Sequence, residues 1–129
     1  MSGRPPIPAI PVAELVLAYG EGRFPMCHDD GELYWHDPDP RAVFPLEGIN
    51  PNARARRAFR QAGFTFSHDR AFERVIRACA DREESWIDER IIASFLALHR
   101  AGYARSVETW DEGELVGGIY GVSLKGAFF

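Results

Sequence analysis

The chain has 129 residues, of which 46% are hydrophobic, 12% aromatic and 26% charged. This composition excludes an intrinsically disordered chain. It is typical of one globular domain, or slightly more, with enough apolar residues to bury a core. The net charge of −4 excludes a protein that is basic throughout, so any contact with RNA requires a local basic patch.

The cysteine content gives a second exclusion. Cys27 and Cys79 form no CxxC pair and are too few for a disulfide framework or a zinc signature. They favour a reducing, cytoplasmic setting. The apolar stretch 12–18 is short and contains Glu14, so it is neither a signal peptide nor a membrane span. We therefore expect no membrane partner.

The chain begins with a proline-rich arm, residues 1–10, which we expect to be flexible. Pro11 suits the first turn of a helix, and apolar residues then recur at helical spacing until Gly20 and Gly22. A loop is expected from Pro25 to Pro45, anchored or functional because it contains large aromatic residues. The residues at helical spacing are Val12, Leu15, Val16 and Tyr19, and the loop aromatics include Tyr34 and Trp35.

The middle of the chain opens with a helix signal. Asn50 and Pro51 predict a helix over residues 53–61 that ends at Gly63. Residues 64–66 alternate in hydrophobicity, and they predict a short strand.

Two capped helices are predicted next. Asp69 is expected to cap the first, and a charged loop, residues 81–85, then leads to Trp86. Asp88 caps the second, which ends at Gly102. Each helix has one apolar face: Phe72, Val75, Ile76 and Cys79 in the first, and Ile91, Ile92, Phe95 and Leu98 in the second.

The last part of the chain changes to strands. Residues 106–110 predict one strand, 111–113 a turn, and 114–124 a second strand. A turn at 125–126 precedes a third strand that begins at 127–129. So short a start would leave backbone groups unpaired, and we therefore expect the chain to be truncated; the alternative is a short, paired C-terminal strand. Helices followed by an antiparallel meander predict the α+β fold class.

Five segments, in this order, carry motif-like patterns: Ala18-Tyr19 with Gly22 to Met26; Trp35, Pro38 and Arg41 with Val43 and Pro45; Cys79 to Ile87; Ser106 to Trp110 with Leu115 to Val122; and Gly126 to Phe129. Together they resemble the leucyl/phenylalanyl-tRNA–protein transferase family. The last segment is similar to the stretch that precedes the family's GESMFS motif.

The resemblance implies a small N-terminal α+β domain, residues 11–68. It would be followed by the first part of a domain similar to the GNAT-type acetyltransferases, residues 69–129. It also implies an aminoacyltransferase that moves Leu or Phe, and also Met, from aminoacyl-tRNA to proteins. The acceptors begin with Arg or Lys and are thereby marked for degradation. No cofactor and no metal are implied, and we expect a monomer.

The same resemblance places the catalytic groups elsewhere. The family's catalytic Asp and Gln, and the glutamate of GESMFS, are expected beyond Phe129. No catalytic residue is therefore assigned in this chain.

Trp86 is the first candidate site residue, because binding aromatics are common between a charged loop and a helix start. The resemblance implies that it lines the pocket for the aminoacyl-adenosine end of tRNA; otherwise it is a core tryptophan. Phe24, Pro25 and Met26 would form the opposite wall and select apolar side chains by size, or would anchor the loop. Tyr19 could likewise serve substrate binding or structure.

Arg54, Arg56, Arg57 and Arg60 form the one dense basic run, and no Asp or Glu interrupts residues 51–62. On a helix they would form a phosphate-binding face for tRNA, or else an ordinary solvated face.

Other polar residues are expected to be structural. Arg41 is near enough in sequence to pair with Asp37 and Asp39. The carboxylates of the charged loop, Asp81, Glu83 and Glu84, could form an acidic lip for an acceptor that begins with Arg or Lys, but the loop is interpreted as solvated. The strand residues Glu108 and Glu114 are expected on the surface, and the four histidines, His28, His36, His68 and His99, form no predicted cluster or zinc site.

Two alternatives differ from this function. A chain that is naturally this short would be a catalytically inactive tRNA-binding fragment. An acetyl-CoA-dependent acyltransferase would need a Gly-rich pyrophosphate loop of the Q/R-x-x-G-x-G/A type at a helix start. No segment fits that pattern, because the glycines at 117–121 lie within a predicted strand.

Overall fold

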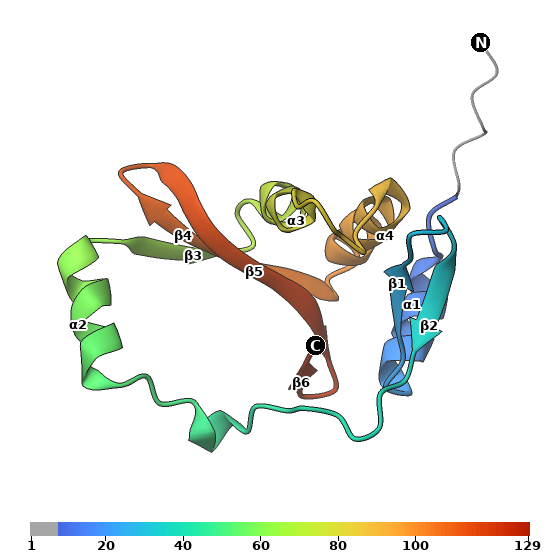
Figure 1. The fold of residues 1–129 in the computed structure, drawn as a ribbon, viewed down its shortest axis with the longest axis horizontal. Coiled ribbons are helices and arrows are strands. Elements are labelled where there is room, and N and C mark those ends of the chain that lie inside the picture. Colours follow the sequence, from blue (N-terminus) through green and yellow to red (C-terminus); the bar gives the residue numbers. More distant parts are fainter. Residues whose placement is uncertain (1–7) are drawn as a thin grey trace, which may run out of the picture.

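The computed structural model describes residues 8–129, and residues 1–7, most of the predicted flexible arm, lie outside the described part. Two helices cover one face of a four-stranded antiparallel sheet, and a two-stranded hairpin lies beside them (Figure 1). The predicted α+β class is confirmed. No helix of residues 8–129 combines the length and the apolar character needed to cross a membrane.

The first helix is joined to the core from its N-terminal side. Helix α1, Val12–Gly20, follows Pro11 as predicted and buries Leu15, Ala18 and Tyr19. Just before it, Ile10 is buried, and its backbone N–H donates to Ser94 Oγ at 2.8 Å. The last residue of the predicted arm is therefore tied to helix α4, Glu89–Arg100.

The predicted loop from Pro25 to Pro45 is wrong in its first half, which folds into a β-hairpin. Strands β1, Phe24–Cys27, and β2, Leu33–His36, pair antiparallel, with Pro25 opposite Trp35. Proline is tolerated because each strand of a two-stranded ribbon is an edge strand, where a missing N–H need not break the ladder. The remaining residues, 37–52, contain a 3₁₀ turn, η1, Leu46–Gly48, and no longer element.

Helix α2, Ala53–Ala62, confirms the predicted helix, although Asn52 rather than Asn50 caps it by accepting from the Ala55 N–H. Gly63 ends it with φ 72°, a conformation that glycine adopts without steric cost. None of its residues is buried, and its backbone approaches no other helix or strand of the described chain. Figure 1 shows α2 projecting beyond the outer end of β3.

The predicted helix cap at Asp69 is wrong. Strand β3, Thr65–His68, leads into a tight turn, where Asp69 has φ 58°. Helix α3, Phe72–Ala80, then begins with no side-chain cap from its N-cap residue. The turn directs the Asp69 carboxylate back to the sheet, where it accepts hydrogen bonds from the Ser106 N–H and from Arg105.

The remaining predicted elements are confirmed. Asp88 caps α4 by accepting from the Ile91 N–H at 2.8 Å. Strands β4, Ala104–Asp111, β5, Glu114–Leu124, and β6, Ala127–Phe128, follow as an antiparallel meander. With β3 paired to β4, the sheet order is β3-β4-β5-β6.

Strand β3 belongs to the same sheet as the strands that follow it. The last strand of the range 11–68 is thus hydrogen-bonded to the range 69–129, and α1 and β1 also contact α4. The division of the chain into two domains and the likeness of the second to acetyltransferases stay predictions.

Helix α3 packs closely on the sheet where β5 has no side chain. A methyl group built on Gly118 would lie 2.9 Å from a methyl of Val75 and 3.1 Å from the Val107 carbonyl oxygen. Val75 is buried and has a branched, stiff side chain. Glycine at this position therefore sets the distance between helix and sheet.

We predict that Gly118→Ala lowers the free energy of unfolding by about 1–3 kcal/mol, because the methyl group overpacks this contact. Denaturant unfolding followed by circular dichroism measures the change. Gly117→Ala is the matched control, since its methyl group would meet Thr109 at an ordinary 3.6 Å. Equal effects of the two substitutions would contradict the packing argument.

Candidate functional site

The hairpin is joined to the segment that carries Trp86. The backbone N–H of Cys27, at the end of β1, donates to the Trp86 carbonyl oxygen at 3.1 Å. The Trp86 side chain is 41% exposed, so this tryptophan is available at the surface. Two candidate segments that are far apart in sequence, 24–26 and Trp86, therefore lie next to each other.

The three candidate residues of β1 do not share one face. Pro25 is fully buried, whereas Phe24 and Met26 are half-buried. Because successive side chains of a strand point to opposite faces, Phe24 and Met26 lie on the side away from Pro25. The Phe24 ring stacks on His36 across the hairpin, with centroids 5.6 Å apart. Pro25 is thus buried in the hairpin, Phe24 also packs partly against the hydrophobic core, and Phe24 and Met26 are each only partly exposed.

Arg41 does not make the predicted pair with Asp37 or Asp39. Its guanidinium lies 5.4 Å from the centre of the Phe24 ring and 5.7 Å from that of Phe129, and it forms no ion pair within residues 8–129. A cation over an aromatic face is attracted by the ring quadrupole. Arg41 therefore connects the hairpin to the end of the sheet.

Tyr19 lies in the core behind these residues. It is 8% exposed and makes edge-to-face contacts with Phe95 and Phe129. Burial raises the pKa of its hydroxyl above the ordinary range, against a smaller opposing effect of Arg41. Tyr19 therefore stays neutral and serves packing in this structure.

Arg90 of α4 joins β1 to the start of its own helix. Its guanidinium approaches the Cys27 sulfur at 3.9 Å and Asp88 at 3.6 Å, and its side chain is 12% exposed. Its buried Nε has no hydrogen-bond partner among the described residues. Burial, together with Asp88, raises the pKa of the Cys27 thiol, so that cysteine is held as a neutral thiol.

A hollow of about 310 Å³ lies beside the Trp86 segment, between the end of α3 and the start of α4. Ile87 and Ile92 give it an apolar part. Asp81, Asp88 and Glu89 give it carboxylates, and Arg77 pairs with Glu89 at 3.0 Å. The charged loop before Trp86 thus contributes one carboxylate, Asp81, to a concave surface.

The four arginines of α2 lie on a separate, exposed surface. At about 100° per residue they span about 160° of the helix circumference, and Phe59 lies on the opposite side. The Phe59 ring contacts Phe66 of β3, with centroids 6.2 Å apart. Because Phe59 faces the sheet, the arginine face is directed into solvent. Arg54, Arg56, Arg57 and Arg60 are all exposed.

Glu108, predicted on the surface, is fully buried, and that prediction is wrong. Its carboxylate accepts hydrogen bonds from Ser67 at 2.6 Å, from Ser106, and from the Arg70 N–H at 3.1 Å. The last bond lies two residues before the first residue of α3, whose N-cap residue Ala71 makes no side-chain cap. Burial opposes ionisation of Glu108, but these donors outweigh it and hold the pKa of the carboxyl below its ordinary 4.5.

Two histidines that we expected not to cluster face each other across the hairpin. His28 Nε2 and His36 Nε2 are 3.0 Å apart, and the rings stack. His99 instead makes a local hydrogen bond, in which its Nδ1–H donates to the Ala104 carbonyl oxygen at 2.7 Å. Within residues 8–129, no group of three His, Cys, Asp or Glu residues is arranged to hold a metal ion.

Sequence reasoning missed three of these arrangements: the hairpin, the burial of Glu108 and the Cys27–Arg90 contact. Only the first had a local signal, the short apolar runs on either side of the Asp-rich turn at residues 28–32. The other two depend on contacts between distant segments.

The chain is similar to known proteins of one family. A family model described as leucyl/phenylalanyl-tRNA protein transferase matches residues 43–129. The chain is similar to the leucyl/phenylalanyl-tRNA–protein transferase of Gloeobacter violaceus, with 54% identity over 89% of this chain and 60% of the relative. The proteins of the same name from Salinibacter ruber and Herpetosiphon aurantiacus are 53% and 44% identical, over 89% and 88% of this chain. The chain spans 51% and 60% of those two relatives, and so covers about half to three-fifths of such proteins.

The structure defines an α+β protein in which an aromatic hairpin and a surface tryptophan meet, while a basic helix projects separately. Because the family model matches most of the chain, the chain belongs to the leucyl/phenylalanyl-tRNA protein transferase family.

The Glu108 network yields a stability prediction. Glu108→Gln should lower the free energy of unfolding by about 1–3 kcal/mol at pH 7, because hydrogen bonds to a charged acceptor are lost. The folded pKa is depressed, so this stabilisation is present above pH 4.5 and is lost as the pH falls through the folded pKa. The difference between the two proteins should therefore shrink in acid.

Urea unfolding between pH 3 and 8 measures this difference. The control is Glu114→Gln on the neighbouring, exposed part of β5, which should change stability by less than about 0.5 kcal/mol. A Glu108→Gln effect that stays constant down to the lowest pH would contradict a depressed pKa.

Proposed function

We propose that this chain forms the aminoacyl-tRNA-binding part of an aminoacyltransferase. The enzyme would move Leu or Phe, and also Met, to the N-terminal Arg or Lys of acceptor proteins and so mark them for degradation. The observation that carries this proposal is the hydrogen bond that joins the β1 hairpin to the exposed Trp86. The names of the relatives support the reaction class.

The reaction depends more on positioning the acceptor amine and the aminoacyl ester than on activating either of them. The acceptor α-amine attacks the ester carbonyl carbon, an amide bond forms, and the bond to the ribose oxygen breaks. The proton lost by the amine ends on that oxygen, which leaves as the free hydroxyl of the tRNA. Because the ester is already activated, correct positioning can supply about 7–11 kcal/mol of the barrier. A binding surface that orients the 3′ end is therefore a large part of the catalyst.

Phe24, Met26 and Trp86 have the character that such a surface needs. The adenine of the tRNA end can stack on the exposed Trp86 indole, which is worth about 1–3 kcal/mol. Phe24 and Met26 are half-buried, and an apolar Leu, Phe or Met side chain can contact the part of each that stays exposed. Pro25 and the buried Tyr19 support this wall from the core side.

The hollow beside the Trp86 segment suits the acceptor protein. The side chain of an N-terminal Arg or Lys is positively charged, while its α-amine reacts in the neutral form. Asp81 and Asp88 line the hollow and offer carboxylates to such a group. The acceptor amine would then approach from the side of α3 and α4.

The arginine face of α2 suits the tRNA backbone. Arg54, Arg57 and Arg60 follow one another at intervals of three residues and point away from the sheet, with no carboxylate on the helix.

We further propose that the chain works as a monomer and that it works in the cytoplasm. The cytoplasmic setting agrees with its two free cysteines.

A binding fragment without catalysis is the second candidate, because no residue of this chain is assigned as a general base. The deciding experiment replaces the matched part of the Gloeobacter violaceus relative with this chain. Transfer of labelled Leu from Leu-tRNA to an Arg-starting peptide is then measured for the hybrid and for the 129-residue chain alone. No transfer by the hybrid at saturating Leu-tRNA would reject the transferase proposal. Transfer by the hybrid alone would make this chain the binding part.

We predict that Trp86→Ala in the hybrid lowers kcat/KM for Leu-tRNA by about 5- to 150-fold, because one base-stacking contact is lost. Trp86→Phe keeps an aromatic face and should retain most of the activity. Steady-state transfer kinetics compare the two variants. If alanine and phenylalanine have the same effect, Trp86 does not stack on the substrate.

A second prediction concerns α2. Replacing Arg54, Arg57 and Arg60 by alanine should weaken tRNA binding by the 129-residue chain and reduce the slope of log K against log salt by about 2 to 3. Filter binding at several salt concentrations measures the slope. The same three positions changed to lysine keep the charge and form the control. An unchanged slope in the alanine variant would remove α2 from the RNA surface.

A further inference from the structure

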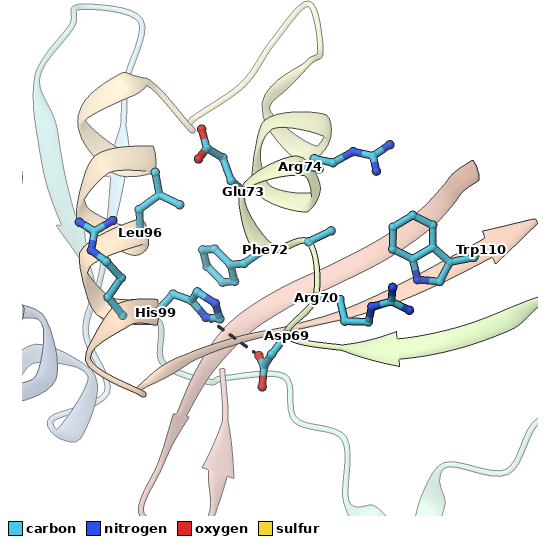
Figure 2. A pocket seen from close by; sticks show the side chains of 10 residues that line it. Asp69, Arg70, Phe72, Glu73, Arg74, Leu96, His99 and Trp110 are labelled. Carbon is cyan, nitrogen blue, oxygen red and sulfur yellow. Dashed lines mark ion pairs between the residues drawn. The ribbon is translucent and has the colours of Figure 1, made fainter. Parts of the chain in front are cut away.

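A second hollow lies apart from the Trp86 segment, where the start of α3 meets β4 and the end of α4. Its volume is about 460 Å³. We call it the Trp110 hollow, and Figure 2 shows its lining. The residues that matter for its chemistry are Asp69, Arg70, Glu73, Arg74, His99 and Trp110.

Two guanidinium groups gather on the Trp110 indole. The Arg70 and Arg74 guanidinium carbons lie 5.7 Å and 5.5 Å from the ring centre. Figure 2 shows Arg70, from the segment before α3, below the indole and Arg74, from the first turn of α3, above it. Two positive charges held at one ring form a local basic patch, which attracts anions.

The indole is itself fixed in place. Its Nε1–H donates to Ser67 Oγ at 2.8 Å, and the Ser67 hydroxyl donates to the buried Glu108 at 2.6 Å. The ring that orients the two arginines is thus tied to the interior of the sheet. Such preorganisation lowers the entropy cost of binding an anion.

The carboxylates of the hollow are engaged elsewhere. Asp69 pairs with Arg105 at 2.8 Å, and Glu73 pairs with Arg77 at 2.9 Å. In Figure 2 the Glu73 side chain points away from Trp110. Within residues 8–129, neither Arg70 nor Arg74 forms an ion pair, and both are exposed. Their positive charge is therefore not neutralised inside the protein.

The position of the hollow favours RNA. Trp110 lies opposite Thr65 at the start of β3, and Gly63 ends α2 two residues earlier. Strand β3 spans about 13 Å, so a ligand that extends over several nucleotides can reach both basic groups. β3 is also the edge strand of the sheet, which leaves its outer side open.

We propose that Arg70 and Arg74, held on Trp110, bind backbone phosphates of the tRNA at a site separate from α2. Guanidinium groups that stack on an aromatic ring keep their N–H edges free to donate to phosphate oxygens. This site rests on the proposed function, since it requires tRNA as a ligand. It extends the RNA surface around the edge of the sheet to α3.

The test compares tRNA binding by the 129-residue chain and by its Arg70→Ala/Arg74→Ala variant over a range of salt concentrations. The variant should bind more weakly, and its slope of log K against log salt should fall by about 1.4 to 1.8, for two phosphate contacts. Arg70→Lys/Arg74→Lys should restore most of the slope. Lys125→Ala, which removes a charge at the far end of β5, should leave it unchanged.

The outcomes separate the two proposals. If the unaltered chain binds no tRNA, both the proposed function and this site are rejected. If the unaltered chain binds tRNA, and the α2 alanine variant weakens binding while the Arg70→Ala/Arg74→Ala variant does not, this site alone is rejected.

ATP is a further probe. If the Arg70→Ala/Arg74→Ala variant loses ATP binding but binds tRNA as before, the hollow is a nucleotide site and the proposal is overturned. Circular dichroism checks that the variants are folded, and a lysine variant without rescue also counts against the site.

Discussion

The hydrogen bond from the Cys27 N–H to the Trp86 carbonyl oxygen fixes the relation between the two halves of the proposed substrate surface. The hairpin has little core of its own, because a two-stranded ribbon is only marginally stable in water. Its strand β1 contacts α1 and α4, and Arg90 reaches from α4 to the Cys27 sulfur. The geometry at Trp86 therefore depends on where α4 sits, and α4 depends on the Asp88 cap and on its buried apolar face.

The second constraint is a buried carboxylate at the junction of three elements. Glu108 of β4 accepts from Ser67 of β3 and from the backbone just before α3. One charged group thus joins β3, β4 and the turn before α3 and, through Ser67, orients Trp110. A buried, ionised carboxylate is tolerated because its donors satisfy it, and removal of one donor leaves part of its hydrogen-bonding capacity unsatisfied.

Much of the fold could be predicted from local signals. Apolar periodicity and the Asp88 cap predict α3 and α4, and the turn glycines predict the strand meander. The hairpin was missed because Pro25 argues against a strand unless the strand is known to lie at an edge. The Asp69 cap failed because a competing partner, the Ser106 N–H, lies on a distant strand. Glu108 could not be placed inside from sequence, since only the fold brings Ser67, Ser106 and the segment before α3 around it.

For the candidate site, the sequence motifs selected Trp86 and residues 24–26. Which side chains of β1 lie on the same face follows from its pairing with β2, which the sequence did not predict.

Helix α2 touches the described body through one aromatic contact, Phe59 on Phe66, and its exposed residues contribute almost nothing to the core. Changes on its outer surface therefore carry little penalty for folding. Natural selection could then vary that surface, charge by charge, to suit a different set of RNA ligands while the remainder of the molecule stays the same. A helix so loosely coupled to the core can change its outer charges without changing the fold that carries it.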